Sequence, residues 1–252
     1  MIRHILLAVA AFMLVSAEEP ILVPDVSQRK IDIVYSFAGV ELLLFGAILY
    51  PDGRIPSRDA DIAVVLRGPT RAITVREKKK LLGMIWANVE SARFLSAPGY
   101  YSVASSRPLN KLIDERTAAI YELGLGNIQL SPADAGSTQK QARFENGLVD
   151  LDRRNALYAE HPGSVEITSG VLYRARLYLP ARVPTGLYTA ETFLIRDGRI
   201  LAVATRDIRI DKSGFERFVA RSAEKWPITY GFAAILLSLL LGVSASLLSR
   251  RI

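Results

Sequence analysis

An uncharged apolar run near the C-terminal end constrains this chain more than any other feature. Ile228–Leu248 contains no charged residue over 21 positions. At about 1.5 Å per residue, a helix of that length spans about 31 Å, which matches a hydrocarbon core about 30 Å thick. Trp226 and Tyr230 flank its start, where membrane helices collect aromatic residues. We predict a transmembrane helix over 227–249, rather than a buried core helix, followed by a cytoplasmic tail over 250–252.

A second apolar stretch, Ile5–Val15, is too short to cross a bilayer. It follows Arg3 and His4, and Val15-Ser16-Ala17 supplies small or compact residues before a cleavage site. This is the layout of a secretory signal peptide. We therefore predict that residues 1–17 are removed on export. The alternative is an N-terminal membrane anchor that stays attached.

The charges around the C-terminal run give a mixed signal about orientation. Arg250 and Arg251 favour a cytoplasmic end, but four cations lie on the other flank: Lys212, Arg217, Arg221 and Lys225. Because long domains are translocated largely regardless of their charge, the signal peptide decides the orientation. We expect a single-pass protein of the inner (plasma) membrane with the bulk of the chain in the periplasm. Without export, the chain would be tail-anchored with a cytoplasmic domain.

Composition excludes several classes of site. The chain has no cysteine, and its histidines are His4 and His161. A disulfide framework and a cysteine nucleophile are excluded, and the one histidine left after signal removal does not make a typical zinc or copper site. We predict no cofactor and no metal. The formal net charge of +7 falls to +4 when Arg3, Arg250 and Arg251 are set aside, which is too weak a bias to indicate a nucleic-acid partner.

Residues 18–212 predict a mainly β fold, an immunoglobulin-like β-sandwich. The expected strands are short runs separated by turns: Ile31–Tyr35, Val40–Tyr50, Ile62–Leu66, Ala72–Val75, Met84–Val89, Tyr100–Ala104, Val165–Thr168, Leu172–Leu179, Gly186–Ile195 and Ile200–Ile210. The almost continuous apolar run at Val40–Tyr50 suggests a strand buried on both faces, and Gly46 within it suggests a bulge. Asp197-Gly198 favours a hairpin turn. Pro184 to Tyr188 resembles the corner that enters a late strand of immunoglobulin-like domains, where the tyrosine bonds the backbone.

We expect a two-helix insertion in the sandwich over about 108–160. Asn110 can cap the first helix, and its apolar positions are Leu112, Ile113, Ala119, Ile120 and Leu123. Gly124 and Gly126 would end it. Ser137 or Thr138 can cap the second helix, whose apolar face is Phe144, Leu148, Leu151 and Tyr158.

A juxtamembrane amphipathic helix is predicted over 213–226. One stripe at helical spacing carries Phe215, Phe218, Val219, Ser222 and Trp226. This stripe either lies in the membrane interface or packs on the sandwich. In the membrane helix, a ridge of small residues recurs every fourth position: Ala234, Ser238, Gly242 and Ser246. Such a ridge lets another helix approach closely, either a second copy or a neighbouring transporter.

Two sets of charged residues are candidate ligand sites. The favoured interpretation of a basic turn at Arg76–Lys80 is the solvated end of a hairpin. Alternatively, this turn contacts an anion or a lipid headgroup. With Tyr100 and Tyr101 beside them, five cations could then converge on an anionic ligand: Lys78, Lys79, Lys80, Arg93 and Arg107. Asp59 and Asp61 can share a strand face. The favoured interpretation is a solvated sheet edge, and the alternative is a pair for acid–base chemistry or calcium binding. No other carboxylates pair in a recognisable way, so no catalytic residue is predicted.

Several short motifs occur in a familiar order. They are Arg67-Gly68-Pro69, Lys80 to Trp86, Pro98-Gly99-Tyr100-Tyr101, Ser105 to Leu109, the Pro184–Tyr188 element, the Asp197-Gly198 hairpin and the terminal membrane helix. The chain resembles the alphaproteobacterial transmembrane protein family Alph_Pro_TM, over nearly its whole length after the signal. The resemblance implies no catalytic residue. It implies an accessory role beside permeases of the sulfite-exporter type, by association alone.

These observations favour a membrane-tethered protein that is not an enzyme. Its partners would be the lipid bilayer and a transporter or a second copy, bound through the membrane helix. The alternatives are a periplasmic anion-binding module and a hydrolase that uses carboxylates.

Overall fold

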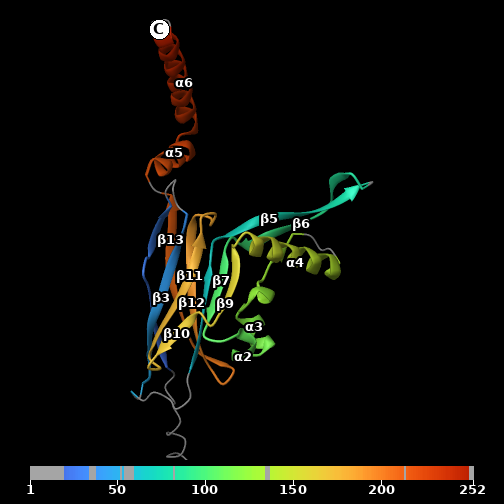
Figure 1. The fold of residues 1–252 in the computed structure, drawn as a ribbon, viewed down its shortest axis with the longest axis vertical. Coiled ribbons are helices and arrows are strands. Elements are labelled where there is room, and N and C mark those ends of the chain that lie inside the picture. The colour runs from blue at the N-terminus through green and yellow to red at the C-terminus, as the bar shows by residue number, and fades with distance from the viewer. Residues whose placement is uncertain are drawn as a thin grey trace, which may run out of the picture.

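The computed structural model describes residues 20–33, 38–51, 53, 60–81, 83–133, 137–212 and 214–249. The predicted signal peptide at 1–17, Tyr35, Asp59 and the predicted tail at 250–252 lie outside these residues. The described chain is mainly β, with few helices and one long apolar helix near its C-terminal end (Figure 1).

The first of two large sheets has four strands in the order β1-β3-β11-β10, all antiparallel. Their bounds are β1 Ile21–Val26, β3 Gly39–Leu49, β10 Val165–Thr168 and β11 Leu172–Pro180. Along β11, Tyr173, Ala175, Leu177 and Leu179 are buried, whereas the residues between them are exposed. This period of two matches the predicted alternation and gives the sheet one buried face.

The structure corrects two expectations about β3. Its burial alternates, with Leu42, Leu44 and Ile48 buried but Phe45 exposed, so the strand is covered on one face only. Its ladders to β1 and β11 run without a register shift, so there is no bulge at Gly46. The glycine is needed for close approach instead, because a Cβ there would lie 2.4 Å from the Val23 carbonyl oxygen and 2.6 Å from Tyr173 Oη.

The second sheet has six strands in the order β2-β13-β12-β4-β7-β9, with β2–β13 and β7–β9 parallel. The bounds are β2 Lys30–Ile33, β4 Asp61–Arg67, β7 Tyr101–Ser105, β9 Tyr158–Pro162, β12 Gly186–Arg196 and β13 Arg199–Lys212. The predicted hairpin of β12 and β13 is confirmed. Asp197 and Gly198 both have positive φ, 50° and 77°, as a type I′ turn requires.

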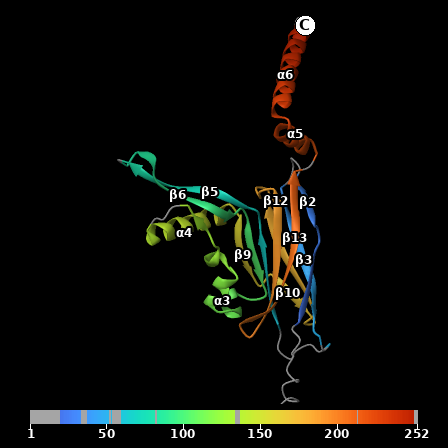
Figure 2. The ribbon, with the colours of Figure 1, turned by 180° about the vertical axis from the view of Figure 1, so that it is seen from behind.

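The two sheets pack face to face and share one hydrophobic core (Figures 1 and 2). Polar bonds cross between them: Tyr173 Oη lies 3.5 Å from Thr192 Oγ1, and Tyr100 Oη donates to the Tyr178 carbonyl at 2.8 Å. Strand β4 is the centre of this core. Its residues Ile62–Leu66 are 0% exposed on both faces, so another layer must cover the outer face of the second sheet.

That outer layer is the insertion, and it differs from the predicted helix pair. The first predicted helix is two short helices, α2 Leu109–Leu112 and α3 Glu115–Ile120, followed by a 3₁₀ turn at Leu125–Asn127. Asp114 caps α3 by accepting from the Thr117 backbone N–H at 2.7 Å. The ring of Tyr121 then packs 5.9 Å from that of Phe193 on β12, on the outer face of the sheet.

The second predicted helix is confirmed as α4, Thr138–Arg154, with Ser137 as its cap. Phe144 and Leu148 are buried, but Leu151 is 51% exposed, and Tyr158 lies in β9 rather than on the helix. The helix ends before Tyr158 because Ala156 takes positive φ, 57°, which breaks the helical path.

Helix α4 packs against a third sheet. Strands β5 Thr70–Leu81 and β6 Ile85–Pro98 form a long hairpin, and the two-residue β8, Ser131–Pro132, pairs with β6. Phe144 and Leu148 of α4 pack against Phe94 and Ala97 of β6 in a second small core. Arg76–Lys80 does not form a turn, because these residues lie within β5 and pair with β6. Its basic side chains are exposed near the end of the hairpin, which agrees with the prediction of a solvated hairpin end.

Two helices follow β13 at the end of the chain. They are α5, Gly214–Lys225, and α6, Pro227–Ser249, and both extend away from the sheets (Figures 1 and 2). The predicted helical spans are therefore confirmed in position.

Candidate functional site

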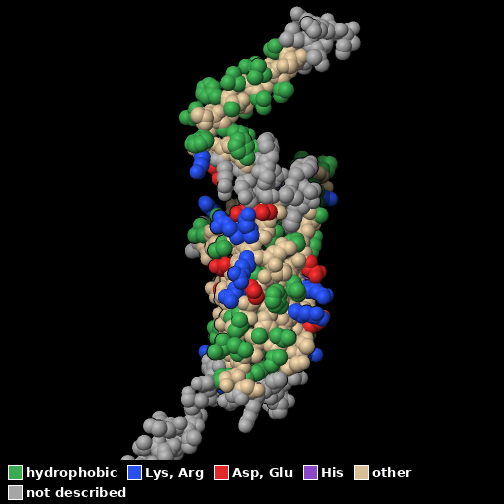
Figure 3. All heavy atoms as spheres, turned by 90° about the vertical axis from the view of Figure 1, so that its left-hand side faces the viewer, with side chains coloured by type: hydrophobic (Ala, Val, Ile, Leu, Met, Phe, Trp, Pro, Cys, Tyr) green, Lys and Arg blue, Asp and Glu red, His purple; other side chains and the backbone are tan. Residues whose placement is uncertain are grey.

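Helix α6 is long and apolar enough to cross a membrane. Within it, the window Pro227–Ser244 has none of its surface buried against the rest of the protein. Figure 3 shows hydrophobic side chains covering the visible face of α6, whereas charged side chains gather on the sheets and on α5. A helix that is apolar all round and uncovered has the length and composition of a membrane span, so α6 is a candidate span rather than a core helix. Exposed leucines from Leu236 to Leu241 supply most of this surface.

The predicted small-residue ridge lies on one side of α6. Ala234, Ser238 and Gly242 are four residues apart, and a Cβ at Gly242 would meet no atom within 4 Å. Ser246 continues the spacing, but its side chain lies outside the description. The Ser238 hydroxyl donates to the Ala234 carbonyl at 2.9 Å, so it is satisfied within the helix. The ridge is therefore a shallow, satisfied surface that another helix can approach.

Helix α5 joins the sheets to this span. Phe218 is 66% exposed and Trp226 is 68% exposed. The side chain of Phe215 lies outside the description. Val219 and Ser222 of the same stripe are half-buried, so the exposed part of the stripe that could meet the membrane interface is its aromatic residues.

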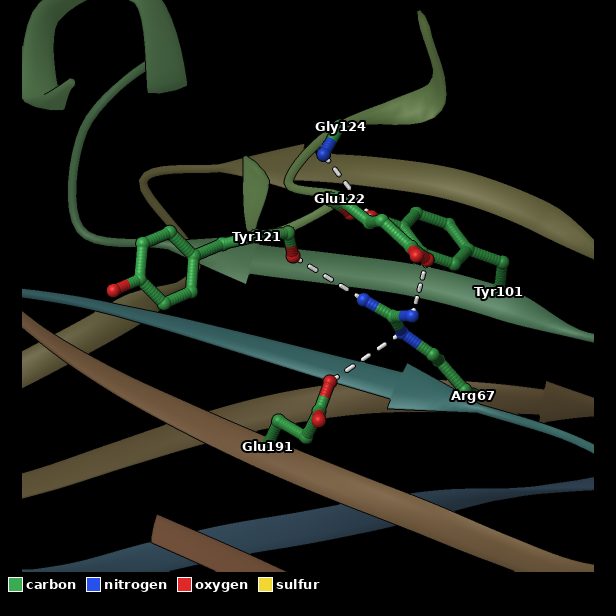
Figure 4. A network of polar contacts seen from close by, with 6 residues as sticks. All are labelled: Arg67, Tyr101, Tyr121, Glu122, Gly124 and Glu191. Carbon is green, nitrogen blue, oxygen red and sulfur yellow. Dashed lines mark hydrogen bonds and ion pairs between the residues drawn. The ribbon is translucent and has the colours of Figure 1, made fainter. Parts of the chain in front are cut away.

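A polar network ties the insertion to the outer face of the second sheet (Figure 4). Arg67 at the end of β4 forms an ion pair with Glu122 and donates to the Tyr121 carbonyl at 3.3 Å. Its Nε lies 3.4 Å from a carboxylate oxygen of Glu191 on β12. The guanidinium also lies 5.8 Å from the ring centroid of Tyr101. The Arg67 guanidinium thus contacts two carboxylates and an aromatic ring, so its role is to hold the insertion on the sheet.

Four fully buried tyrosines strengthen the same region. Each hydroxyl donates to a backbone carbonyl: Tyr100 to Tyr178, Tyr101 to Glu122, Tyr158 to Pro98 and Tyr188 to Pro184, at 2.6–2.8 Å. Burial raises the pKa of Tyr100 to about 12, and it raises the pKa of Tyr101 further. These phenols remain protonated and serve as cross-links. The predicted role of Tyr100 and Tyr101 beside an anion is therefore wrong, because both lie in the core.

A cleft of about 580 Å³ lies between β7, β9 and the insertion. Its wall is apolar, with Val103, Ile113 and Leu123. Its polar lining includes Asp114, Glu115, Asn127, Glu160 and His161, and no lysine or arginine is among the described lining residues. Glu160 accepts from the Leu125 backbone N–H. An acidic lining repels anions, so this cleft does not suit the predicted anionic ligand.

The five cations predicted to bind an anion do not form one site. Lys78, Lys79 and Lys80 lie toward the free end of β5, and Arg93 lies in the middle of β6. Arg107 comes just before α2, an element that lies away from the free end of β5 and β6 in Figure 1. There it forms a two-pronged ion pair with Asp61. The prediction assumed that the chain turns at Lys78–Lys80. Because these lysines instead lie in the 12-residue strand β5, they are carried away from Arg107.

Asp61 has a structural role. Ser106 Oγ donates to it at 2.7 Å, and Arg107 Nε donates at 2.9 Å. Burial alone would raise the pKa of Asp61, but the bonds from Arg107 and Ser106 outweigh burial and lower it. A carboxylate held ionised by an arginine is a poor general acid or base near neutral pH. Among the described residues, no group of three or more His, Asp or Glu could hold a metal ion.

Most of the chain matches a known protein family. A family model described as "Putative transmembrane protein (Alph_Pro_TM)" matches residues 21–251. The chain belongs to the Alph_Pro_TM family. The match covers the sheets, the insertion and α6 together, so the membrane helix is part of what defines the family. Neither a curated protein nor a solved structure matches the chain.

Sequence reasoning missed the network that holds this Alph_Pro_TM protein's insertion in place. Arg67, Glu122 and Glu191 come from three segments, and Arg67 and Glu122 are 55 residues apart in the chain. No local spacing predicts such a pairing. The available signal was weaker: Arg67 follows an apolar strand directly, and Tyr100-Tyr101 precedes another. Charged and aromatic residues at the ends of strands are therefore candidates for ion pairs and hydrogen bonds that hold an inserted segment on the sheet.

Proposed function

We propose that this Alph_Pro_TM protein is a membrane-tethered, non-enzymatic accessory protein of a transporter. The observation that carries the proposal is α6, a span with no buried surface and a ridge of small residues along one side. Transmembrane helices associate by close packing at such small residues, since lipid offers no hydrophobic drive. A transporter, which presents many helices in the same plane, fits this ridge.

The orientation in this proposal places the sheets in the periplasm and the end of α6 in the cytoplasm. It is supported by the signal-like segment Ile5–Val15 and by Arg250 and Arg251 beyond the span. The sheets would then stand just outside the inner membrane. α5 connects them to α6 with Trp226 at the junction.

We also propose that the two sheets form an immunoglobulin-like sandwich. Two features support this assignment. The strand order β1-β3-β11-β10 follows the A-B-E-D order of such domains, and β2-β13-β12-β4-β7 follows A′-G-F-C-C′, with β9 added at the outer edge of the second sheet. Tyr188, near the start of β12, donates to the Pro184 carbonyl four residues upstream, as the tyrosine corner of that fold does. This fold assignment by itself does not indicate an activity, because one fold can host many unrelated functions.

The non-enzymatic part of the proposal is supported by what the polar groups do. Arg67, Asp61 and Glu160 each hold a backbone or side-chain partner within the fold. These groups fasten the insertion to the sheets. The anion-binding alternative loses its main support because the predicted cations lie apart.

Photo-crosslinking in membranes tests the transporter contact. A benzophenone amino acid at Ser238 on the ridge should capture a polytopic transporter, and the same probe at Leu240, on the other side of α6, should capture far less. Gly242→Leu should lower the yield at 238 by about tenfold, since a large side chain blocks close approach. Ser244→Leu makes a similar change off the ridge and should leave the yield unchanged.

Three outcomes would contradict this proposal. Equal capture from both sides of α6 would mean that the ridge is not a packing surface. Capture of only a second copy of this chain would replace the transporter by a homodimer. Insensitivity to Gly242→Leu would show that close packing at the ridge is not required.

A further inference from the structure

The hairpin of β5 and β6 extends well beyond the part that α4 covers. Midway along the hairpin, where Glu77 pairs with Glu90, α4 holds it by ion pairs: Arg143 lies 2.8 Å from Glu90 and 3.4 Å from Glu77. Beyond this pair, the hairpin bends away from α4 and ends free of the sheets (Figures 1 and 2). A projecting hairpin without a hydrophobic face packed on something is only marginally stable in water. We therefore expect the end of the hairpin to be stabilised by contact with another surface.

Apolar side chains dominate the end of the hairpin. Met84 is 81% exposed, Ile85 is 65% exposed and Trp86 is 62% exposed. Met84 lies in the turn, and Ile85 and Trp86 begin β6 with side chains on opposite faces, so apolar side chains cover both faces of the hairpin end. Soluble surfaces rarely leave such a cluster uncovered. The tip therefore has the composition of a binding surface.

Basic side chains lie directly behind this tip. Lys78, Lys79 and Lys80 precede the turn on β5, and Lys80 pairs with Trp86 in the ladder. Lys79 also forms an exposed ion pair with Glu77 at 3.4 Å, which high-dielectric surroundings keep weak. Lys80 Nζ lies 5.3 Å from the centroid of the Trp86 ring. Aromatic and aliphatic residues in front of a row of cations are the side chains that membrane interfaces select. The lysines would meet anionic headgroups while the tip enters the acyl boundary.

The position of the tip agrees with this chemistry. In Figures 1 and 2 the hairpin reaches the level at which β13 ends and α5 begins. This is the end of the molecule from which α6 leaves. Because α6 has the length and composition of a membrane span, the bilayer surface lies at this end. The tip thus approaches the same bilayer at a point to one side of α6.

We propose that the tip of the β5–β6 hairpin is a second membrane contact, in which Met84, Ile85 and Trp86 enter the lipid interface and Lys78–Lys80 bind anionic headgroups. This inference rests on the anchoring of the chain by α6 in the proposed function, but not on the transporter. A single span leaves the sheets free to turn about its axis. Two contacts fix the orientation of the sheets and hold the acidic cleft and the insertion in a set position over the bilayer.

Depth-dependent quenching in vesicles tests this contact. Because the chain has no cysteine, one fluorophore can be attached to the full-length protein at Met84→Cys. A matched probe goes at Leu172→Cys, an exposed residue of β11. The protein is reconstituted in vesicles of phosphatidylcholine and phosphatidylglycerol that carry spin-labelled lipids. We expect lipid quenching of about twofold or more at position 84, because interfacial segments lie about 5–10 Å deep, and none at position 172.

A charge-reversal variant separates headgroup binding from apolar insertion. Lys78→Glu, Lys79→Glu and Lys80→Glu together should reduce quenching at position 84 in anionic vesicles. Vesicles of phosphatidylcholine alone should show weaker quenching for the unmodified lysines, with little difference between the two proteins. Added inorganic phosphate should not compete if the anion is a headgroup held in the bilayer.

The outcomes distinguish this inference from the proposed function. If the protein is integrated in vesicles but the probe at 84 is quenched by aqueous iodide and not by lipid, the hairpin contact is wrong. If iodide and lipid both fail to quench it, a protein surface covers the tip, and the lipid assignment is wrong. If the protein does not float with vesicles at all, α6 does not anchor it, and both proposals fail together.

Discussion

Two aspartates in α6 are expected to release the protein from membranes. In Leu237→Asp with Leu241→Asp, each charge near the middle of the span costs about 2.5–3.5 kcal/mol of insertion free energy. The leucines they replace are 60% and 63% exposed and give up their own favourable transfer as well. Wild-type protein should stay in the membrane pellet after alkaline carbonate extraction, whereas the variant should move to the supernatant.

The control for this experiment uses the same chemistry on the sheets. Leu172→Asp with Leu187→Asp replaces two leucines that are each 54% exposed, outside the span. This protein should remain in the pellet. An α6 variant that also stays in the pellet would show that α6 is not the anchor, and it would favour a retained N-terminal segment instead.

Two glycine-to-alanine substitutions are expected to change stability in opposite directions. At Gly46 the added methyl would lie 2.4 Å from the Val23 carbonyl oxygen and close to Tyr173 Oη, so a strand must shift. Such overpacking costs about 1–3 kcal/mol of unfolding free energy. At Gly147, within α4, the methyl meets nothing within 4 Å, and Ala should stabilise the helix by about 1 kcal/mol.

Thermal unfolding of the full chain in detergent, followed by circular dichroism, measures both effects. For a domain of this size, about 1 kcal/mol shifts the Tm by roughly 2–4 °C. The two variants should therefore lie on either side of wild type. If Gly46→Ala matched wild type, the crossing of Tyr173 over β3 would be wrong, and with it the tight pairing of β1, β3 and β11.

The elements that sequence predicted well are those decided by local chemistry. The β12–β13 hairpin follows from Asp197-Gly198, whose backbone the turn needs, and α4 follows from its cap at Ser137. Strand β11 follows from strict alternation, and α6 from the absence of charge. In each case the signal lies within one segment, so no knowledge of distant contacts is required.

The elements that sequence predicted wrongly are those decided by tertiary contacts. Arg76–Lys80 has the composition of a turn, but pairing with β6 keeps it in an extended strand. The apolar stretch from Leu112 to Leu123 has helical spacing, but Asp114 starts a new cap and divides it. At the candidate sites, Asp61 pairs with Arg107, 46 residues away, which removes both from the predicted ligand sites. Such partners depend on the topology of the sheets.

The central claim is that the sheets stand outside the cytoplasm, held by α6. Single cysteines test it directly, since the chain has none of its own. Leu172→Cys reports on the sheets, and Ile252→Cys reports on the other end of the span. In bacterial spheroplasts, a membrane-impermeant maleimide should label position 172 at once and position 252 only after the membrane is permeabilised. The reverse pattern, with position 172 labelled only after permeabilisation, would contradict the account.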